Sequence, residues 1–414
     1  MDAIILSIGS ELVLGESVDT NSAWLSARLG EIGLHVIRHV TVGDDIEPIR
    51  RQIEEACAEA AVVLITGGLG PTADDLTRQA IAAAMGVDLV LLPDWLDRIR
   101  DFFTCRGRQM PEANAIQAHF PAGSEPLENT RGTAPGIRAS IGRATVFALP
   151  GVPGEMREMF ERRVRPELAA RTAGAVLLTT TLHCFGAGES DVGRLIDDLM
   201  ARGRNPAVGT TAKQGVIGVR IFARGDSADQ ARRRLDETAS EVRRRLGTLI
   251  FGQDADTLAD AVARLLVACR RTVSVAESCT GGLIAKWLTD VPGSSQYFQA
   301  GLVAYANEAK TRLLGVPAES IERCGAVSET VARDMAERCR ALNATDFALS
   351  VTGIAGPQGG SPDKPVGLVY ICLSDAAGCT VTRHRIGEFL ARDDIRRRAA
   401  STALNLLRLR LLEI

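Results

Sequence analysis

A serine beside two glycines is the residue of this chain best placed for nucleophilic chemistry. Ser278 lies in the stretch Glu277-Ser-Cys-Thr-Gly-Gly282, directly after a short apolar run that contains Val273 and Val275. The run predicts a β-strand, and the glycines before the apolar-periodic segment Leu283–Leu288 predict a tight turn and a helix start. A hydroxyl held there can attack a carbonyl carbon while backbone N–H groups stabilise the oxyanion. The alternative is a Ser/Thr N-cap of an ordinary helix.

The base for this serine has to be a lysine or a lysine–tyrosine pair. Only one of the five histidines, His384, lies beyond residue 250, so a Ser-His-Asp triad is poorly supported. The chain has 48 basic residues, and four of them are lysines: Lys213, Lys286, Lys310 and Lys364. A desolvated lysine can lose its proton whereas arginine cannot, so these lysines are candidates for acid–base work. The alternative is a compositional bias toward arginine.

Three stretches that end strands are expected to meet at one edge of a sheet: Glu277–Gly282, Tyr305–Lys310 and Thr352–Gly360. With Asn307 as N-cap, Lys310 falls in the first helical turn, and helix side chains lean toward the N-terminus. The amine then reaches back toward the strand of Tyr305, which predicts that Ser278, Tyr305 and Lys310 come together. The alternatives are an aromatic residue at a strand end and an exposed helix charge. No His/Cys/Asp spacing indicates a metal site in this part of the chain.

Glycine-rich, acidic loops form a second candidate site near the N-terminus. Residues 1 to about 170 alternate strand and helix patterns, which predicts βαβ units and a parallel sheet. Ligands bind such sheets at the carboxyl ends of the strands, where the chain has Gly9-Ser-Glu11, Gly43-Asp-Asp45 and Gly67–Thr77. Glycines and carboxylates there can hold a phosphate and Mg²⁺. Alternatively, Asp74 and Asp75 only favour the first turn of a helix.

The predicted elements fall into three groups along the chain. The first has strands Ala3–Ile8, Val36–Val42, Ala61–Thr66 and Ala144–Leu149, helices Asn21–Ile32, Ile46–Ala60, Thr72–Met85, Trp95–Cys105 and Gly154–Leu168, and the turns Arg131–Gly136 and Leu149–Glu155. The second has strand Leu177–Phe185, a helix from Gly188 to Ala201, hairpin strands Pro206–Thr211 and Val216–Ala223, and helix Asp226–Leu246. The third has helices Thr257–Cys269, Asn307–Leu314, Ser328–Leu342 and Asp393–Leu412 with strands Ala300–Tyr305, Phe347–Thr352, Val366–Ser374 and Val381–Ile386.

The second group has the α-β-β-α order of a KH-type module, which would suggest RNA binding. Its only Gly-x-x-Gly, Gly215–Gly218, lies in the hairpin instead of between helices. The arginine runs Arg232–Arg234 and Arg243–Arg245 are interleaved with acidic residues. We therefore favour a structural spacer with a solvated helix face over nucleic-acid binding.

Composition is that of a soluble globular protein of two or three domains. Hydrophobic residues make up 46%, charged residues 24%, and the net charge is −3, which gives no electrostatic footprint for nucleic acid. No apolar run reaches transmembrane length, and the N-terminus lacks a basic leader. The nine cysteines are dispersed without a Cys-x-x-Cys pair, which indicates reduced thiols and a cytoplasmic location.

The N-terminal motifs resemble the molybdopterin-binding-type domain of the CinA family. They are Ile8–Glu11, Gly67–Thr77, Gly132–Gly136 and Pro150–Glu155. The resemblance implies that Asp44 and Asp75 sit at the ligand, with Mg²⁺ or another divalent metal at these two carboxylates. It also implies, for some members, a metal-dependent ADP-ribose pyrophosphatase. The expected ligand site comprises Glu11, Asp44, Gly67, Gly68, Gly70, Thr72, Asp75, Thr77, Thr133 and Glu155.

The C-terminal motifs are similar to the CinA C-terminal domain. They are Ala276–Gly282, Tyr305–Lys310, Gly325–Glu329 and Thr352–Gly367. The resemblance implies a cofactor-independent nicotinamide mononucleotide deamidase with Ser278 as nucleophile and Tyr305 and Lys310 in support. The amides of Thr280–Gly282 would hold the oxyanion, and the loop Gly353–Gly360 would hold the ribose phosphate. The expected substrate-binding residues are Thr280, Gly281, Gly282, Asn307, Thr352, Gly353, Gly356 and Lys364.

Together these observations predict an α/β protein with two parallel-sheet α/β domains, residues 1–170 and 253–414, joined by a small α+β KH-like module, residues 171–252. The expected function is amide hydrolysis on nicotinamide mononucleotide, with small-molecule nucleotides as ligands, no membrane and a homodimer as the family implies. The alternative is a pterin- or nucleotide-binding, competence-associated protein without amidase activity.

Overall fold

The computed structural model describes residues 1–172 and 176–414, and the chain divides into two units. The first comprises Met1–Thr179 with Ala223–Leu235, and the second comprises Thr180–Phe222 with Asp236–Ile414. Residues 173–175, near the start of the predicted 171–252 module, lie outside the described residues. No helix among the described residues is both long and apolar enough to span a bilayer.

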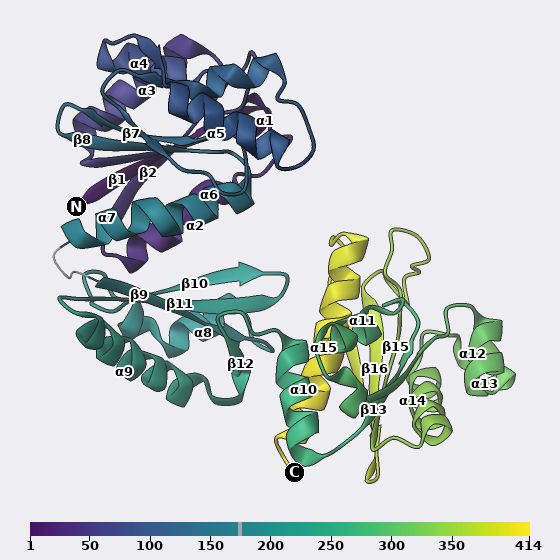
Figure 1. Cartoon of the computed structure of the whole chain (residues 1–414). Helices are drawn as coiled ribbons and strands as arrows, with labels where there is room; N and C mark the ends of the chain where they lie inside the picture. The colour runs from purple at the N-terminus through teal and green to yellow at the C-terminus, as the bar shows by residue number, and fades with distance from the viewer. Residues whose placement is uncertain (173–175) are drawn as a thin grey trace. The chain divides into compact units, whose positions relative to one another are not determined.

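A six-stranded sheet organises the first unit in the order β2-β1-β3-β8-β7-β6 (Figure 1). Its bounds are β1 Asp2–Ile8, β2 His35–Val42, β3 Val62–Thr66, β6 Glu125–Leu127, β7 Gly136–Ile141 and β8 Ala144–Leu149. The strands β2, β1, β3 and β8 are parallel, as predicted, and β7 and β6 add an antiparallel edge. Buried residues run along β1 and β3 without alternation, because helices cover both faces of the sheet.

The helices of this unit form two layers. On one face lie α3 (Ile46–Glu59) and α4 (Thr77–Met85), and on the other lie α2 (Thr20–Glu31), α6 (Pro153–Met159) and α7 (Arg165–Arg171). The helix predicted over Thr72–Met85 begins five residues later, since 72–76 form a turn. The single helix predicted over Gly154–Leu168 is interrupted by a π-turn, Phe160–Val164, because Pro166 has no amide to donate. Outside the main sheet lie α1 (Ser10–Val13), α5 (Pro93–Thr104) and the strand pair β4 (Leu89–Leu91) and β5 (His119–Pro121).

The central module has a four-stranded sheet in the order β10-β11-β9-β12. Its elements are β9 Val176–Cys184, α8 Glu189–Leu195, β10 Ala207–Lys213, β11 Val216–Gly225, α9 Ala228–Leu246 and β12 Ile250–Gln253. The predicted hairpin is present, and its turn residues Gln214 and Gly215 both have positive φ. The strand β12 was not predicted, since four residues carry too short a pattern.

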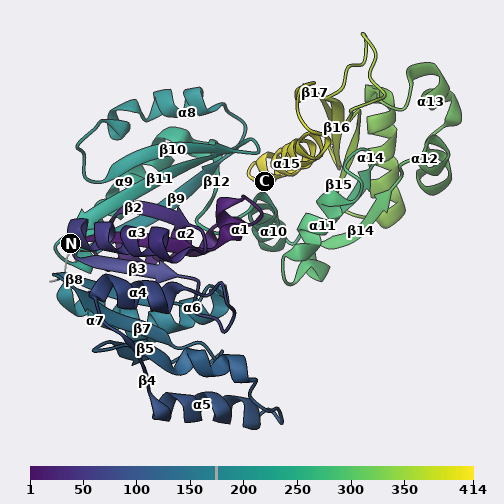
Figure 2. The ribbon, with the colours of Figure 1, turned by 90° about the horizontal axis from the view of Figure 1, so that it is seen from above.

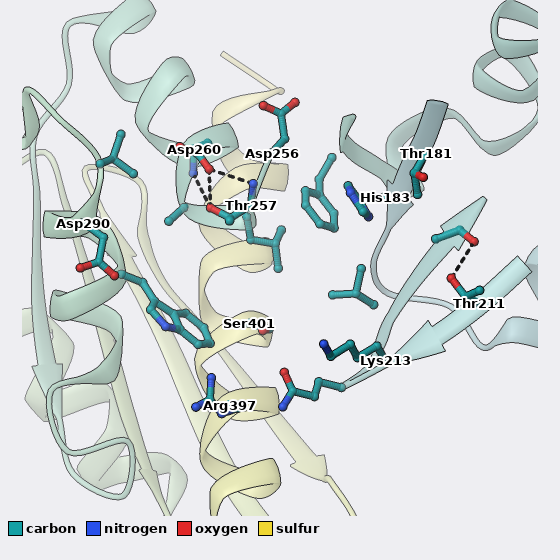
Figure 3. Close-up of a pocket in the computed structure, with 18 residues that line it drawn as sticks. Thr181, His183, Thr211, Lys213, Asp256, Thr257, Asp260, Asp290, Arg397 and Ser401 are labelled. Atoms are coloured by element: carbon teal, nitrogen blue, oxygen red, sulfur yellow. Dashed lines mark hydrogen bonds between the residues drawn. The ribbon is translucent and has the colours of Figure 1, made fainter. Parts of the chain in front are cut away.

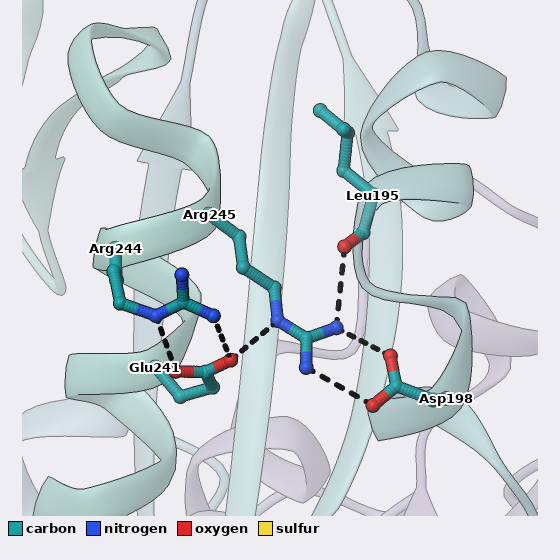
Figure 4. Close-up of polar contacts among 5 residues, drawn as sticks. All are labelled: Leu195, Asp198, Glu241, Arg244 and Arg245. Carbon is teal, nitrogen blue, oxygen red and sulfur yellow. Dashed lines mark hydrogen bonds and ion pairs between the residues drawn. The ribbon is translucent and has the colours of Figure 1, made fainter.

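Two arginines of the run at the end of α9, Arg244 and Arg245, are paired with acids of the same module (Figure 4). Glu241 accepts hydrogen bonds from Arg244 and Arg245 at 2.6 Å each, and Arg245 also pairs with Asp198. The guanidinium groups hold the pKa of Glu241 at about 2. Because these charges are compensated locally, they offer little to a phosphate backbone, in line with the expected solvated helix face.

The C-terminal part has a five-stranded sheet in the order β14-β13-β15-β16-β17. Its bounds are β13 Val273–Glu277, β14 Phe298–Val303, β15 Phe347–Gly353, β16 Leu368–Asp375 and β17 Gly378–Arg385. The strands β14, β13 and β15 are parallel neighbours, and β16 and β17 continue the sheet antiparallel. The three loops that follow the parallel strands therefore share one edge, as the sequence predicts.

Helices cover both faces of this sheet (Figures 1 and 2). On one face pack α10 (Leu258–Cys269), α11 (Leu283–Asp290) and α15 (Arg392–Leu411), and on the other α12 (Asn307–Leu314), α13 (Ala318–Cys324) and α14 (Glu329–Asn343). Ala306, and not Asn307, precedes the first helical residue of α12, and no side chain caps that helix. The helix α13 was not predicted. The fold class is confirmed: two mixed α/β sheet domains with a KH-like module between them in the chain.

Candidate functional site

Ser278 and Lys310 are in direct contact at the edge where the three parallel strands end. The amide of Ser278 donates to the Val351 carbonyl of β15 at 2.9 Å, which fixes the turn against the sheet. Lys310 lies in the second turn of α12, directly after β14. Its Nζ lies 3.1 Å from Ser278 Oγ, although the two residues are 32 positions apart. The structure therefore brings together the predicted nucleophile and the predicted amine.

The amine of Lys310 is surrounded by oxygen atoms and hidden from water. Lys310 is 1% exposed, and its Nζ donates to the carbonyls of Ala304 and Tyr305 at 3.0 Å each. Burial lowers the pKa of Lys310 below its usual 10.5, because the charged form loses hydration. A neutral amine has two N–H donors and one lone pair. With both donors on carbonyls, the lone pair is left for the Ser278 hydroxyl proton, as a general base requires.

The neighbouring thiol does not compete as a nucleophile. Cys279 is 5% exposed, and burial raises the pKa of its thiol to about 12. The thiolate is the reactive form of cysteine, and almost none is present at neutral pH with such a pKa. Ser278 is therefore the only member of the turn with both a hydroxyl and a base beside it.

A buried carboxylate holds the turn that follows Ser278. Glu277 is 1% exposed and accepts hydrogen bonds from the amides of Gly282 at 3.0 Å, Ile284 at 3.1 Å and Ala285 at 2.8 Å. These amides lie at the N-terminus of α11, where a helix supplies no acceptor of its own. Glu277 thus caps α11 from the preceding strand and sets the position of the turn. The sequence analysis did not assign it a role, although a carboxylate next to a glycine-opened helix is a recognisable signal.

Replacing Glu277 by glutamine is expected to lower the free energy of unfolding by roughly 1–3 kcal/mol, because an amide NH₂ would face backbone donors in a buried place. Chemical denaturation of the full chain measures the change. The matched control is Glu308→Gln, at an exposed position of α12, which should stay within about 0.5 kcal/mol of the parent. Equal stabilities of the two variants would contradict the capping role.

The amides available to an oxyanion differ from the predicted set. The sequence pointed to Thr280, Gly281 and Gly282. The two glycine amides already donate, one to a backbone carbonyl at 3.0 Å and the other to the carboxylate that caps α11. In the part of the chain that the structure describes, the amides of Cys279 and Thr280 donate to no group. Thr280 Oγ1 is likewise buried without a partner. These three donors are the ones left for a negatively charged oxygen.

The Tyr305 hydroxyl lies apart from the Ser278–Lys310 pair. Tyr305 is 57% exposed, and its hydroxyl accepts a hydrogen bond from Arg392 at 2.7 Å. Among the described residues no hydrogen bond joins this hydroxyl to Ser278 or Lys310. Tyr305 supports Lys310 through its backbone carbonyl, and a catalytic role for its side chain stays a prediction.

Two arginines at the start of α15 reach all three loops of the site. Arg392 donates to Tyr305 as described and to the Gly356 carbonyl at 2.5 Å, and Arg396 donates to the Thr280 carbonyl at 2.8 Å. The sequence analysis missed both arginines, since a closing helix more than 100 residues away shows no link to the turn. They add positive charge at a site expected to receive a phosphate.

The other predicted substrate-binding residues have mixed surroundings. Thr352 Oγ1 donates to the Ala326 carbonyl at 2.8 Å. Lys364 Nζ donates to the carbonyl of Cys324, the last residue of α13, at 2.7 Å and to that of Val327 at 2.9 Å. Lys364 therefore ties down its own loop instead of standing free for a phosphate. A Cβ on Gly353 would lie 2.8 Å from the Leu368 carbonyl, so only glycine fits there. Asn307 is exposed at the first position of α12.

A cavity of about 440 Å³ opens at the carboxyl ends of the parallel strands in the first unit. Eight of the ten predicted ligand residues line it: Glu11, Asp44, Gly67, Gly68, Gly70, Asp75, Thr133 and Glu155. The other two support its wall, since Thr77 Oγ1 donates to the Gly67 carbonyl at 2.8 Å and the Thr72 hydroxyl donates to Asp75 at 2.5 Å. Asp74 and Gln117, which the prediction omitted, also line the cavity.

The two predicted metal ligands are engaged by the protein itself. Asp44 accepts from the Ser10 amide at 2.8 Å, and Asp75 accepts from the amides of Gly70 at 2.7 Å and Thr72 at 2.9 Å. Within residues 1–172 and 176–414, no group of three or more His, Cys, Asp or Glu side chains is arranged to hold a metal ion. As placed, these carboxylates do not by themselves fit a resident divalent cation.

A buried arginine supports the glycine loop through hydrogen bonds to its backbone carbonyls. Arg78 is 1% exposed and donates to the carbonyls of Leu69 at 2.7 Å and Gly70 at 2.6 Å. Burial lowers the pKa of Arg78 to about 10. Sequence reasoning missed this residue. The pattern that could have found it is an arginine in the first turn of the helix that follows the glycine loop.

Three family models match consecutive parts of the chain. The model of a probable molybdopterin binding domain matches residues 4–170, that of the damage-inducible protein CinA KH domain matches 179–252, and that of the CinA C-terminal domain matches 255–411.

Full-length relatives share almost half of the sequence. A CinA-like protein of Geobacter sulfurreducens is 46% identical over 414 residues, covering 100% of both chains. A putative competence-damage inducible protein of Symbiobacterium thermophilum is 44% identical over 418 residues, covering 99% of this chain and 98% of that one.

Solved structures of similar proteins cover a smaller share of the chain. The protein CinA from Thermoplasma acidophilum, described as of unknown function, is 32% identical and covers 40% of this chain and 97% of that one, with a TM-score of 0.38. A competence/damage inducible protein from Agrobacterium tumefaciens is 41% identical and covers 38% and 97%, with a TM-score of 0.35.

Proposed function

The chain belongs to the CinA family, and from that premise we propose that its C-terminal domain hydrolyses the carboxamide of nicotinamide mononucleotide to give nicotinate mononucleotide and ammonia. The observation that carries the proposal is the 3.1 Å contact between Ser278 Oγ and the buried Lys310 amine. Acyl transfer at a neutral amide requires a nucleophile with a base in hydrogen-bond reach, and this pair supplies both.

In the acylation step, neutral Lys310 takes the Ser278 hydroxyl proton while Ser278 Oγ bonds to the carboxamide carbon. The carbonyl oxygen becomes an oxyanion, to which the amides of Cys279 and Thr280 and the Thr280 hydroxyl are free to donate hydrogen bonds. The carbon–nitrogen bond then breaks, the nitrogen takes the proton back from Lys310, and ammonia leaves.

In the deacylation step, a water molecule gives a proton to Lys310 and attacks the ester carbon. The bond to Ser278 Oγ breaks, the oxygen takes the proton from Lys310, and nicotinate mononucleotide is released. Lys310 therefore serves as base and then as acid in each half of the reaction, and burial, which lowers the pKa of Lys310, favours the neutral amine that this cycle needs.

The substrate phosphate is assigned to the arginines at the start of α15. Arg392 and Arg396 reach the three loops, and guanidinium groups bind phosphate in a bidentate manner. The loop Gly353–Gly360 supplies backbone close to them through Gly356. Lys364 contributes indirectly, since its amine already holds its own loop in place.

The cavity of the first unit favours a second, nucleotide-directed function. Its acidic and glycine-rich lining is the feature that supports an ADP-ribose pyrophosphatase, as the resemblance implies, or the binding of a pterin or nucleotide. The carboxylates of Asp44 and Asp75 already accept hydrogen bonds from backbone amides of the protein. The homodimer and the cytoplasmic location stay predictions.

Ammonia release from nicotinamide mononucleotide by the full chain tests the proposal, and the rate is expected to be unchanged by EDTA, since no step of the mechanism needs a metal. ADP-ribose with added Mg²⁺ is the parallel substrate. Phosphate-ester products from ADP-ribose without any ammonia from nicotinamide mononucleotide would move the chemistry to the first unit and overturn the amidase assignment.

A further inference from the structure

A cavity of about 690 Å³ in the second unit lies outside both sites described above (Figure 3). Its walls come from β9, the β10–β11 hairpin, α10, α11 and α15. Figure 3 shows Lys213 and Arg397 near one end and Asp256, Thr257 and Asp260 near the other. Its volume falls in the range usual for small-molecule sites.

Direct contacts fix the walls of this cavity. Arg408 is 3% exposed and donates to the carbonyls of Thr248 at 2.5 Å and Ile250 at 3.2 Å, which ties α15 to the central module. Phe185 and Val216 pack against the core of the C-terminal domain. The hairpin and α15 therefore hold one arrangement, and the space between them is a preformed cavity.

The acids that line the cavity are already paired. Asp256 accepts from Arg264 at 2.7 Å, Asp260 accepts from the Thr257 amide at 2.8 Å in a capping box, and Asp290 pairs with Lys286 at 2.5 Å. The charges of Asp256 and Asp290 are compensated by Arg264 and Lys286, and the Asp260 carboxylate is occupied by the capping box of α10.

Three donors in the cavity, in contrast, are free. Within the described parts of the chain, the Lys213 amine, the Trp287 indole N–H and the Ser401 hydroxyl have no hydrogen-bond partner. Free donors opposite satisfied acids favour a ligand rich in acceptors and negative in charge. Arg397, which pairs with Asp393 at 2.5 Å, adds a guanidinium at the same end as Lys213.

Aromatic rings line the cavity from three different elements, α11, β9 and β12. Trp287 comes from α11, while His183 and Phe251 stack on each other at 5.8 Å with an interplanar angle of 21°. Apolar side chains such as Leu258 and Val291 complete these walls. A flat ring with a polar edge matches such a lining, since aromatic faces favour stacked or edge contacts.

We propose that this cavity is a binding site for a nucleoside monophosphate, with the phosphate beside Lys213 and Arg397 and the base among the aromatic residues. The site is separate from the Ser278 turn, and the inference does not depend on the amidase function. It combines the two features that such a ligand needs, a cationic end and an aromatic wall, in a cavity of sufficient volume.

Equilibrium dialysis of the full chain with AMP tests the proposal, with adenosine and inorganic phosphate as partial ligands. AMP is expected to bind, and Lys213→Ala and Trp287→Leu are each expected to weaken AMP binding roughly 10-fold. The control Arg220→Ala removes an exposed positive charge from β11, outside the cavity, and should leave the affinity unchanged. Lys213 is exposed, so its replacement keeps the fold even if the Trp287 variant unfolds.

Undiminished AMP binding by Lys213→Ala, or no AMP binding by the parent chain, would overturn the site. If inorganic phosphate bound as tightly as AMP, the aromatic wall would add nothing to the affinity, and the proposed position of the nucleobase would be wrong. Ammonia release at the parental rate by Lys213→Ala, together with weakened AMP binding, would support a site distinct from the amidase.

Discussion

Ser278→Ala is expected to lower ammonia release from nicotinamide mononucleotide by about 10⁴-fold or more, since removal of a nucleophile eliminates the covalent route. Among the described residues, the Ser278 hydroxyl is hydrogen-bonded only to the Lys310 amine, which keeps two carbonyl acceptors after the substitution. The loss should therefore fall on kcat, with little change in the midpoint of thermal unfolding. Substrate should still bind, because the arginines at the start of α15 are untouched.

The matched control is the adjacent Cys279→Ala, which removes the thiol of the turn and keeps its backbone amide. This variant should retain most of the activity, since burial keeps the Cys279 thiol protonated. Rapid-quench mass spectrometry of the parent should find a nicotinoyl ester on the peptide that contains Ser278. A Ser278→Ala protein that releases ammonia at the parental rate, or loss confined to Cys279→Ala, would refute the assigned nucleophile.

The meeting of Ser278 and Lys310 followed from patterns that the sequence contains. Apolar runs of strand length predicted β13 and β15, glycines predicted the turn, and parallel order placed the three loops at one edge. The lean of helical side chains then brought Lys310 back to the strand end. The Ser278–Lys310 contact is insensitive to the error in the predicted cap, because a cap at Ala306 instead of Asn307 shifts the start of α12 by one residue only.

The supporting residues of the site could not be predicted in the same way. Arg392 and Arg396 act across more than 80 residues of chain, through the packing of α15 on the sheet, and no local pattern encodes that packing. Glu277 was visible in the motif, but its three amide contacts depend on the precise path of the turn. The surroundings of Asp75 likewise depend on the path of its loop. Its carboxylate was expected to bind a metal, and in the structure it accepts hydrogen bonds from amides of its own loop.

The sheet at each end of the chain contains antiparallel strands whose direction the sequence analysis did not predict. In the first unit, β7 and β6 follow an irregular segment, so their short patterns carry no signal of direction. In the C-terminal part, β16 and β17 were predicted as strands, but only the structure gives their antiparallel order. Neither addition disturbs the candidate sites, because ligands gather at the carboxyl ends of the parallel strands.

Lys310→Met is expected to lower kcat/KM by about 10²–10⁴-fold, the usual contribution of a general base, while the fold is retained because methionine is uncharged and similar in length. Lys310→Arg should lose activity too, since a guanidinium does not give up its proton. Burial lowers the pKa of Lys310 below 10.5, and the neutral amine is the active form. The parent should therefore gain activity as pH rises through the lowered pKa, and the rising limb should lie below pH 10.5.

The pH profile separates the role of Lys310 as base from a role in packing. In Lys310→Met the rising limb should disappear from the residual activity, whereas a packing defect would lower the rate at every pH and leave the limb in place. The control Lys286→Met removes an exposed lysine of α11, whose side chain is 64% exposed, and should keep both the rate and the limb. Among the described residues, the buried Lys310 amine is the only base that is hydrogen-bonded to Ser278. A Lys310→Met enzyme with an unchanged pH profile would therefore require another proton acceptor and would end the proposed mechanism.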